Sequence, residues 1–327
     1  MSSSDLIEIV IASGKGGVGK STIAASLAII LRNSGYKVTA IDADAEAPNL
    51  HLVLGIDRWD RVIEYHEGRI GSIRDDKCIY CGYCYESCAF NAVEEKDGKY
   101  IINPWICEGC FTCSFVCPVK AISFKYNVLA GHIRIAYKTP YKFPLVSSKI
   151  KPGRPNSGKL VTEAKNLGRS ISGGKGVIIV DAAAGIGCQV IASLAGSHMA
   201  ILVAEPTPAS FSDLRRIHKI TKHFGIPSAL IVNKYDLNKV FVQEIMRYAE
   251  KENIELLGLL PYDHAVPRSM AINKPVIYAY PNSSVVKSII ETSNKLLAIL
   301  RNWENWKLKH IPEKIEPFIP IIIKPGS

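Results

Sequence analysis

Cysteine spacing is the feature of this sequence that most restricts what the chain can fold into. Eight of the nine cysteines form two runs that read C-x2-C-x2-C-x3-C, and the second run repeats the first 29 residues later at every position. They are Cys78, Cys81, Cys84, Cys88, Cys107, Cys110, Cys113 and Cys117. Small secreted proteins use many cysteines as disulfides, but a chain of 327 residues can bury a core without them. The duplicated runs therefore predict two metal centres within one unit.

Each run resembles the cluster-binding motif of bacterial ferredoxins, and Pro118 follows the second run as in those proteins. In that family the fourth cysteine of each run ligates the cluster of the other run. The resemblance implies two 4Fe–4S clusters and a role in electron transfer. One cluster would be held by Cys78, Cys81, Cys84 and Cys117, and the other by Cys88, Cys107, Cys110 and Cys113.

Structural zinc is the alternative interpretation of the cysteines. Zinc ribbons pair two C-x-x-C motifs, which leaves the third and fourth cysteines of each run unexplained. Ala89 stands in the first run where the second has Pro118, but this difference removes no ligand. We therefore expect a small α+β ferredoxin domain over residues 72–127.

The amino-terminal segment predicts a strand, a glycine-rich loop and a helix. An apolar run from Leu6 to Ala12 precedes Gly14-Lys15-Gly16-Gly17-Val18-Gly19-Lys20-Ser21-Thr22, and an apolar-periodic segment follows through about Leu31. In this P-loop motif, backbone N–H groups and the helix N-terminus hold phosphates, the lysine reaches the β- and γ-phosphates, and the hydroxyl binds Mg²⁺. We expect Lys20 to contact phosphate, Ser21 to ligate Mg²⁺, and the loop from Gly14 to Thr22 to bind the nucleotide.

The additional lysine at position 15 indicates which type of phosphate loop this chain contains. The stretch from Lys15 to Thr22 resembles the deviant Walker A loop of the MinD/ParA/Mrp ATPases, a group that includes the nitrogenase iron protein. The resemblance implies ATP or ADP with Mg²⁺, ATP hydrolysis, and a nucleotide-dependent homodimer in which Lys15 reaches the phosphates of the partner. A solvated loop charge is the alternative interpretation of Lys15.

Three aspartates at predicted strand ends are similar to further motifs of that group. Asp42 and Asp44 follow the strand 37–41 and resemble switch I, whose second aspartate orients the attacking water and whose first lies near the metal. Asp181 follows a strand at 177–180 and resembles the Walker B aspartate that holds Mg²⁺. The resemblance thus assigns hydrolysis to Asp44 and Mg²⁺ binding to Asp42 and Asp181. Taken alone, each aspartate could merely cap a strand end.

The base of the nucleotide has two interpretations. The residues Asn233-Lys234-Tyr235-Asp236 match the N-K-x-D guanine motif of GTPases. In the MinD-like group, however, an asparagine at this strand end contacts adenine, and the following loop closes over the base. Because the deviant loop belongs to ATPases, we expect ATP with Asn233 and Pro261 at the base, and GTP remains the alternative.

Apolar strand candidates alternate with helical segments along most of the chain. The strands are expected at 6–12, 37–41, 177–181, 199–204, 229–232 and 256–260, and the helices at 20–33, 208–224, 238–253 and 284–301. This alternation predicts an α/β fold with a doubly wound, mostly parallel sheet. We expect residues 1–71 and 128–327 to form this MinD-like P-loop domain, with 72–127 inserted and 128–158 as a partly extended, basic connector.

Charge and hydropathy limit the partners. Lysine and arginine number 40 against 30 aspartates and glutamates, and nine of the basic residues lie between positions 132 and 169 with Glu163 as the one acid. We expect this basic stretch to dock an acidic redox protein in preference to nucleic acid. No apolar run reaches the ~20 residues of a membrane span, and the prolines at 317–325 argue against a helix lying on a membrane. We expect a cytoplasmic protein.

The leading functional hypothesis is an ATPase whose nucleotide state gates electron transfer through the two clusters. An Mrp-type carrier that hands clusters to other proteins is the first alternative, and a ParA-like DNA-binding positioning ATPase is the second. The ninth cysteine, Cys188, lies seven residues after Asp181, the distance at which the nitrogenase iron protein has a cluster ligand. We interpret Cys188 as a small buried residue, with a redox role as the alternative.

Overall fold

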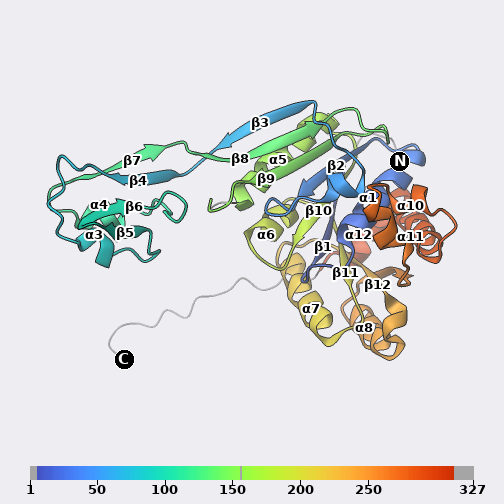
Figure 1. Ribbon diagram of the computed structural model, residues 1–327. Coiled ribbons are helices and arrows are strands. Elements are labelled where there is room, and N and C mark those ends of the chain that lie inside the picture. Colours follow the sequence, from blue (N-terminus) through green and yellow to red (C-terminus); the bar gives the residue numbers. More distant parts are fainter. Residues whose placement is uncertain (1–5, 155–156, 313–327) are drawn as a thin grey trace, which may run out of the picture.

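One nine-stranded sheet forms the centre of the computed structural model, which describes residues 6–154 and 157–312 (Figure 1). The strand order is β13-β12-β11-β1-β10-β2-β9-β8-β3. These strands are β1 Leu6–Ser13, β2 Val38–Ala43, β3 Arg61–His66, β8 Leu129–Ala136, β9 Leu145–Ile150, β10 Gly176–Ala184, β11 Met199–Ala204, β12 Ser228–Asn233 and β13 Glu255–Leu260. All neighbours from β13 to β9 pair in parallel, so the prediction of a mostly parallel α/β sheet is confirmed.

Helices cover both faces of the sheet, as parallel strands that are apolar on both sides require (Figure 1). One face carries α1 Lys20–Asn33, α2 Leu50–Val53, α9 Ala265–Ala271, α10 Val276–Ala279, α11 Ser284–Arg301 and α12 Trp303–His310. The other carries α5 Ser157–Ser172, α6 Cys188–Leu194, α7 Pro208–His223 and α8 Lys239–Lys251. Among the described helices, none combines the length and apolar character needed to traverse a membrane. The proline-rich stretch 317–325 lies outside the described residues.

Three strands enlarge the sheet beyond the strands that were predicted. β9 joins the parallel set beside β2, and β8 pairs antiparallel with both β9 and β3. β8 and β9 occupy much of the stretch 128–158 that the sequence suggested as a partly extended connector. The β3–β8 ribbon leads from the edge of the sheet to the cysteine-rich segment, residues 69–126, which lies beside the main body in Figure 1.

The cysteine-rich segment contains two small antiparallel sheets and two short helices. The first sheet pairs β4 Arg69–Ile73 with β7 Ile122–Tyr126, and the second pairs β5 Val93–Lys96 with β6 Lys99–Ile102. The helices, α3 Tyr83–Glu86 and α4 Thr112–Val116, each contain the third cysteine of one run. The segment is therefore built of α and β elements that are separate from the main sheet.

The 29-residue repeat of the sequence is also present in the backbone of this segment. Left-handed φ angles recur in pairs at Tyr80 and Gly109 (55° and 64°), Gly82 and Phe111 (79° and 71°), and Asn91 and Lys120 (51° and 52°). The N–H of Ala92 donates to Cys88 Sγ at 3.3 Å, and that of Ala121 donates to Cys117 Sγ at 3.2 Å. The two halves are thus one structural unit used twice.

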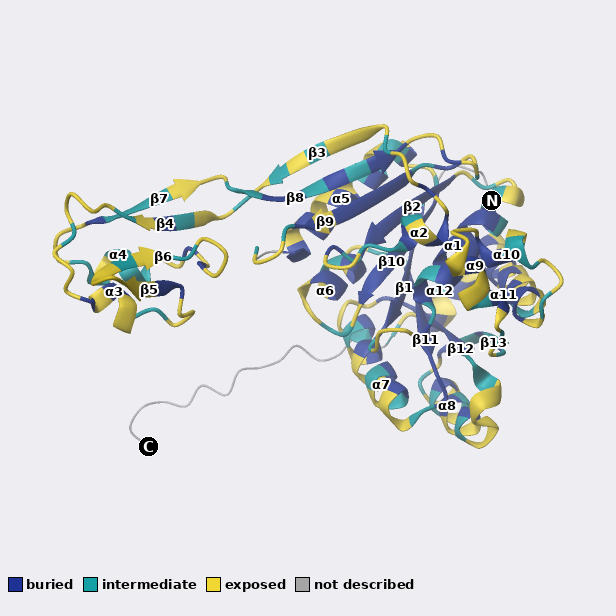
Figure 2. Cartoon of the chain, viewed as in Figure 1, coloured by how far each residue is buried: buried dark blue, intermediate teal, exposed yellow. Residues whose placement is uncertain are grey.

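Few side chains of the cysteine-rich segment are buried (Figure 2). Its buried apolar residues are Cys84, Ala92, Val93, Cys107 and Ala121. So small a core contributes little hydrophobic stabilisation. We therefore expect the stability of this segment to depend on what its cysteines bind.

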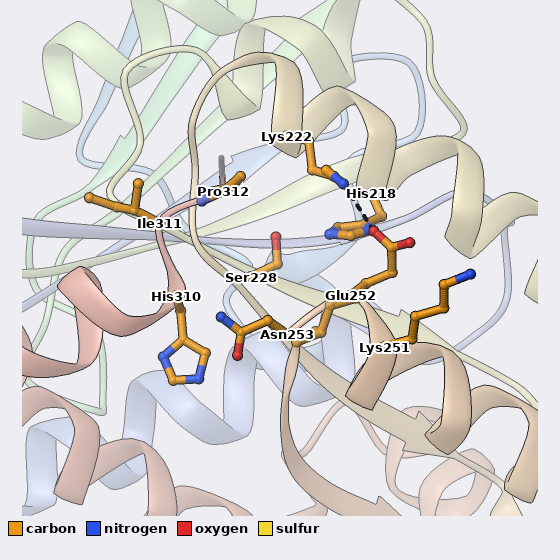
Figure 3. Close-up of a pocket in the computed structure, with 10 residues that line it drawn as sticks. His218, Lys222, Ser228, Lys251, Glu252, Asn253, His310, Ile311 and Pro312 are labelled. Carbon is orange, nitrogen blue, oxygen red and sulfur yellow. Dashed lines mark hydrogen bonds and ion pairs between the residues drawn. The ribbon is translucent and has the colours of Figure 1, made fainter. Parts of the chain in front are cut away.

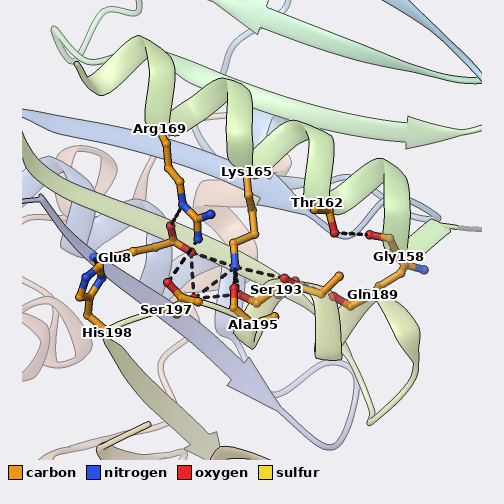
Figure 4. Close-up of polar contacts among 12 residues, drawn as sticks. Glu8, Gly158, Thr162, Lys165, Arg169, Gln189, Ser193, Ala195, Ser197 and His198 are labelled. Atoms are coloured by element: carbon orange, nitrogen blue, oxygen red, sulfur yellow. Dashed lines mark hydrogen bonds and ion pairs between the residues drawn. The ribbon is translucent and has the colours of Figure 1, made fainter. Parts of the chain in front are cut away.

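A buried polar cluster joins β1 to helices α5 and α6 (Figure 4). The carboxylate of the fully buried Glu8 contacts Lys165 Nζ at 2.9 Å and Arg169 Nε at 2.7 Å. Lys165 Nζ also donates to the carbonyls of Ala192 and Ala195, at 3.1 and 2.8 Å, where α6 ends. Burial pushes the pKa of Glu8 upward, but Lys165 and Arg169 more than offset this and lower the pKa below its ordinary value. These contacts fix α5 and α6 to each other and to β1.

Replacing Lys165 with methionine is expected to lower the free energy of unfolding by about 3–5 kcal/mol, because Glu8 stays buried with one cation fewer. Urea denaturation measures the change. Lys287→Met on α11, where the lysine is exposed, is the matched control and should change stability by less than about 0.5 kcal/mol. Equal losses in the two variants would contradict the prediction.

The same cluster predicts how stability depends on pH. A carboxylate whose pKa is lowered on folding stabilises the folded state above its ordinary pKa of 4.5, and this contribution disappears as the pH falls through the lower folded value. The part of wild-type stability that Glu8 supplies should therefore be lost at acidic pH and not at pH 7.

Candidate functional site

The glycine-rich loop connects β1 to α1 at the carboxyl edge of the parallel strands. Gly17 and Gly19 have φ angles of 76° and 94°, in the left-handed region that favours glycine. A Cβ at Gly19 would also lie 2.5 Å from Asn233 Nδ2, so this position has no room for a side chain. The helix begins at Lys20, and its first N–H groups are those that an anion at this end would bind.

A cavity of about 380 Å³, open to solvent, lies over this loop. Nine of the fourteen predicted nucleotide-site residues line it: Gly16, Gly17, Gly19, Lys20, Ser21, Thr22, Asp44, Asn233 and Pro261. The other five do not: Gly14, Lys15, Val18, Asp42 and Asp181. The structure therefore brings the P-loop, the second aspartate of switch I and the two base candidates to one cavity of a size that ligands occupy.

The five residues outside the cavity wall have different positions. Gly14 packs against Asp213, because a Cβ at Gly14 would lie 2.5 Å from Asp213 Cβ. Val18 is fully buried, whereas Lys15 is exposed. Asp42 and Asp181 are 0% and 1% exposed. The exposure of Lys15 leaves its ammonium group free of the cavity of its own chain.

The two buried aspartates carry the electrostatic signature of a cation site. Both carboxylate oxygens of Asp181 are buried without a hydrogen-bond partner among the described residues. Burial raises the pKa of Asp181 to about 7, and the nearby Ser21 hydroxyl and the charge of Lys20 only partly oppose this. Burial and then Asp181 raise the pKa of Asp42 well above its ordinary value, although the Leu50 N–H donates to Asp42 at 3.1 Å. Two buried carboxylates whose charge the protein offsets only in part, with the Ser21 hydroxyl beside the cavity, fit a Mg²⁺ ion.

Asn233 and Lys234 hold the backbone of the phosphate loop. The amide of Asn233 donates to Val18 O at 2.8 Å, and Lys234 Nζ donates to Gly17 O at 3.3 Å. Lys234 also forms an ion pair with Glu205. The N-K pair of the motif therefore positions the loop, a role that the sequence analysis did not assign to either residue.

One wall of the cavity is apolar and escaped the sequence analysis. Val53 on α2 and Val266, Pro267 and Met270 on α9 line this wall. They belong to short helices that carry no recognisable motif. The sequence could have indicated this wall only through the position of these apolar residues shortly after strand ends. An apolar wall opposite a phosphate loop suits the base of a nucleotide.

The eight cysteines of the two runs line two separate cavities. One contains Cys78, Cys81, Cys84 and Cys117, and the other contains Cys88, Cys107, Cys110 and Cys113. Each cavity takes three cysteines from one run and the fourth from the other run, which is the grouping that the ferredoxin resemblance implies. Apolar side chains such as Ile122 and Phe124 complete the walls. The four thiols of each set therefore face a common, largely apolar space.

The chemistry of these sets differs from that of a single-ion site. Within the described ranges, no three histidine, cysteine, aspartate or glutamate side chains converge where one metal ion could sit. The thiolates of a 4Fe–4S cluster bind different irons and so surround a volume, which fits these cavities. Burial raises the pKa of the Cys84 thiol and raises that of Cys113 to about 11, while the Thr112 hydroxyl lowers that of Cys110. Cluster binding would displace the thiol protons.

Cys188 begins α6 and is exposed, so the interpretation of this cysteine as a buried residue is wrong. Gly158 at the start of α5 packs against it, since a Cβ at Gly158 would lie 3.0 Å from Cys188 O. Ala182 and Ala183 are buried in β10, but the chain reaches the surface from Ala184 onward, which is why the Cys188 side chain is accessible.

The basic stretch between residues 132 and 169 is largely engaged within the chain. The guanidinium group of Arg134 lies 4.5 Å from the ring centre of Trp59, and Arg154 donates to Pro104 O at 3.1 Å. Lys159 pairs with Glu67, and Lys165 and Arg169 pair with Glu8. Five of the nine cations therefore have internal partners, which weakens the expectation that this stretch docks an acidic protein.

A further pocket lies between α7, α8 and the end of α12 (Figure 3). It is lined by polar groups that include His218, Lys222, Glu252 and His310. Lys222 Nζ lies 3.0 Å from Glu252, and burial lowers the pKa of His218 to about 4. None of the predicted nucleotide or cysteine residues lines this pocket, and its one glutamate is paired with Lys222, one of its two lysines.

Comparison with known proteins agrees with the geometry of the nucleotide cavity. Residues 9–276 match the CobQ/CobB/MinD/ParA nucleotide binding domain family. An uncharacterised protein of Methanocaldococcus jannaschii is 32% identical over 297 residues, covering 89% of this chain and 96% of that protein. An iron-sulfur cluster carrier protein of Pyrococcus horikoshii is 24% identical, covering 90% of this chain and 86% of the carrier.

Solved structures show the same fold. The septum site-determining protein MinD of Pyrococcus horikoshii, complexed with Mg-ADP, superposes with a TM-score of 0.55 at 19% identity, covering 90% of this chain and 98% of that one. With the phosphate loop at the end of β1, the cavity above it and the family match over most of the length, this chain belongs to the CobQ/CobB/MinD/ParA family of nucleotide-binding P-loop proteins.

Proposed function

We propose that this protein is a Mg²⁺-dependent ATPase that acts as a nucleotide-switched homodimer and gates electron transfer to a redox partner. The observation that carries the proposal is that one chain holds both a P-loop cavity and two cavities of four cysteines each. Two 4Fe–4S clusters, when bound there, supply one-electron transfer. The family match supports nucleotide binding, and the crossed grouping of cysteines supports the clusters.

Each residue of the nucleotide cavity has a role in this proposal. The loop N–H groups and Lys20 hold the phosphates, and the Ser21 hydroxyl with the carboxylates of Asp42 and Asp181 holds Mg²⁺. Asp44 lines the cavity and orients the attacking water. Lys15, exposed on the loop, reaches the phosphates of the second subunit. Asn233 keeps the loop in place, and Pro261 with the apolar wall contacts the adenine.

A cluster carrier is the second candidate function. Proteins named as iron-sulfur cluster carriers, from Pyrococcus and Aquifex, are 22–25% identical to this chain over about 90% of its length. Under this alternative the cysteine cavities would load and release clusters. Four cysteines around each apolar cavity suit retention better than release, and for this reason we favour electron transfer.

The gating proposal is tested with anaerobically reconstituted protein. The rate at which the reduced protein passes electrons to an artificial acceptor is measured with Mg·ADP and with a non-hydrolysable Mg·ATP analogue. We expect the two rates to differ about fivefold or more, the range in which ligands couple to distant sites. Identical rates in all nucleotide states would contradict gating.

The same preparation separates the second candidate. Incubation with an iron-free ferredoxin as acceptor, followed by chromatographic separation of the two proteins, measures how much iron has left the protein. Retained iron with nucleotide-dependent electron transfer supports the first proposal. Transfer of most of the iron to the acceptor supports a carrier.

A further inference from the structure

The cysteine-rich segment contacts the main body through side chains at the start of α5 and just before it. The guanidinium group of Arg154 donates to Pro104 O at 3.1 Å and lies 5.9 Å from the ring centre of Trp105. Lys159 forms an ion pair with Glu67, which follows β3 where the ribbon continues into the segment. Lys159 thus joins the ribbon to the first turn of α5, and Arg154 joins the segment to the chain that precedes this helix.

The amino-terminal end of α5 also touches the region after Asp181. Gly158 packs closely against Cys188, the first residue of α6, since a Cβ at Gly158 would lie 3.0 Å from Cys188 O and 3.1 Å from Cys188 Cβ. At the opposite end of α6, Lys165 of α5 donates to the last carbonyls of α6 and contacts Glu8 (Figure 4). Helices α5 and α6 are thus joined near both ends of α6, with Lys165 lying midway along α5, and Glu8 anchors this contact to β1 at the end of the strand farther from the P-loop.

Gln189, the second residue of α6, joins this helix pair to switch I. Its side-chain oxygen accepts the N–H of Ala45 at 2.7 Å, and its amide donates to Glu46 at 2.7 Å. Gln189 is 7% exposed, so both contacts are shielded from solvent on the glutamine side. The two residues it holds directly follow Asp44, which lines the nucleotide cavity. A buried amide with a donor and an acceptor bond fixes both the position and the orientation of this segment.

These contacts form one continuous path from the nucleotide cavity to the cysteine-rich segment. Packed helices with specific polar contacts at each end move as bodies rather than deforming continuously, so a shift of residues 44–46 displaces the start of α6 and with it the start of α5. The anchored end at Glu8 would then act as the pivot, and the displacement would be largest at Arg154 and Lys159.

We propose that Gln189 is the positioning residue through which the nucleotide state of switch I reaches the cysteine-rich segment, with α5 and α6 carrying the displacement to Arg154 and Lys159. The inference rests on the proposed function, because it requires switch I to respond to the γ-phosphate. The proposed function does not specify how the nucleotide cavity and the cysteine-rich segment are connected, and these contacts supply that connection. Four polar contacts gain a role that nucleotide binding does not give them: the two of Gln189, that of Arg154 and that of Lys159.

Hydrogen exchange measured by mass spectrometry on the full-length, cluster-loaded protein tests the route. In the wild type, exchange in peptides covering 61–67 and 105–107 should differ about fivefold between Mg·ADP and a non-hydrolysable Mg·ATP analogue. In Gln189→Ala this difference should disappear, while the dissociation constant for the nucleotide changes less than about threefold. Gln243→Ala, an exposed glutamine on α8, is the matched control and should behave as the wild type.

Two further variants keep the route testable if Gln189→Ala fails to fold. Glu46→Ala removes the exposed carboxylate that accepts the hydrogen bond of the Gln189 amide. It should reduce the nucleotide-dependent difference in exchange in both peptides. Arg154→Ala should abolish the difference at 105–107 but leave that at 61–67, because the Lys159–Glu67 pair remains. Arg247→Ala on α8 is its control.

The outcomes distinguish this inference from the function on which it rests. If Gln189→Ala and Glu46→Ala keep the wild-type difference, the route is wrong while gating survives. If the wild type itself shows no nucleotide-dependent exchange in either peptide, the route is also wrong, and the electron-transfer rates decide gating separately. A merely structural glutamine would change exchange in α6 equally in both nucleotide states and leave the difference in the distant peptides intact.

Discussion

Pairs of cysteine substitutions are expected to remove either one cluster or both, depending on which cavity the cysteines line. Cys78→Ser with Cys117→Ser alters a single cavity, so iron should fall from about eight to about four atoms per chain. Cys107→Ser with Cys117→Ser alters both cavities, although these two cysteines belong to the same run, and iron should fall close to zero. Iron and acid-labile sulfide assays on anaerobically reconstituted protein measure the difference.

Both double variants lose the same number of thiols, so each serves as the control of the other. Cys188→Ser should keep about eight irons, because Cys188 lines neither cavity. Two zinc ions without sulfide in the wild type would contradict the cluster assignment. An iron content near four in the variant with Cys107 and Cys117 replaced would instead show that each run binds its own cluster.

The duplicated cysteine runs illustrate what spacing alone can supply, whereas their crossed grouping came from the ferredoxin resemblance. Ligand positions that recur 29 residues apart imply a duplicated backbone, and the structure repeats its left-handed positions at Tyr80 and Gly109 with the same offset. Apolar runs such as 199–204 are equally informative, because a strand covered on both faces must be apolar along its whole length. These signals are local, which is why the sequence predicted the parallel strands and the P-loop.

Contacts between segments far apart in the chain leave no such local pattern in the sequence. Arg134 and Lys165 counted as part of one basic stretch, yet Arg134 stacks on Trp59 and Lys165 is buried against Glu8. Asn233 was assigned to the base by its place at a strand end and it lines the cavity, but its amide also reaches Val18 in the phosphate loop, which the sequence did not predict. Gln189 has no motif at all, and its role follows from its bonds to switch I. Tertiary pairing decides these roles, and a single sequence does not encode it locally.

Asp181→Asn is expected to have two large effects of opposite sign. The variant should raise the thermal midpoint of the nucleotide-free protein at pH 8, by about 2–4 °C for each kcal/mol added to the free energy of unfolding. The reason is that it removes a buried charge whose oxygens have no hydrogen-bond partner among the described residues. It should also lower the ATP hydrolysis rate about 100- to 1000-fold, because an amide is a poor ligand for the Mg²⁺ that neutralises the phosphates. Differential scanning fluorimetry and phosphate release measure the two effects.

The pH dependence and a matched variant separate burial of charge from catalysis. A carboxyl group whose pKa is raised from 3.8 to about 7 opposes folding only when it ionises, so the stability gained by Asp181→Asn should vanish near pH 4 and reach its full size above pH 7. Asp44→Asn should lose hydrolysis to a similar extent but keep the stabilisation by Mg·ADP, since Asp44 lines the cavity and is only half-buried. If Asp181→Asn retained the Mg²⁺-dependent part of that stabilisation, the buried carboxylate would not belong to the metal site. Its oxygens would then destabilise the folded protein without contributing to nucleotide binding.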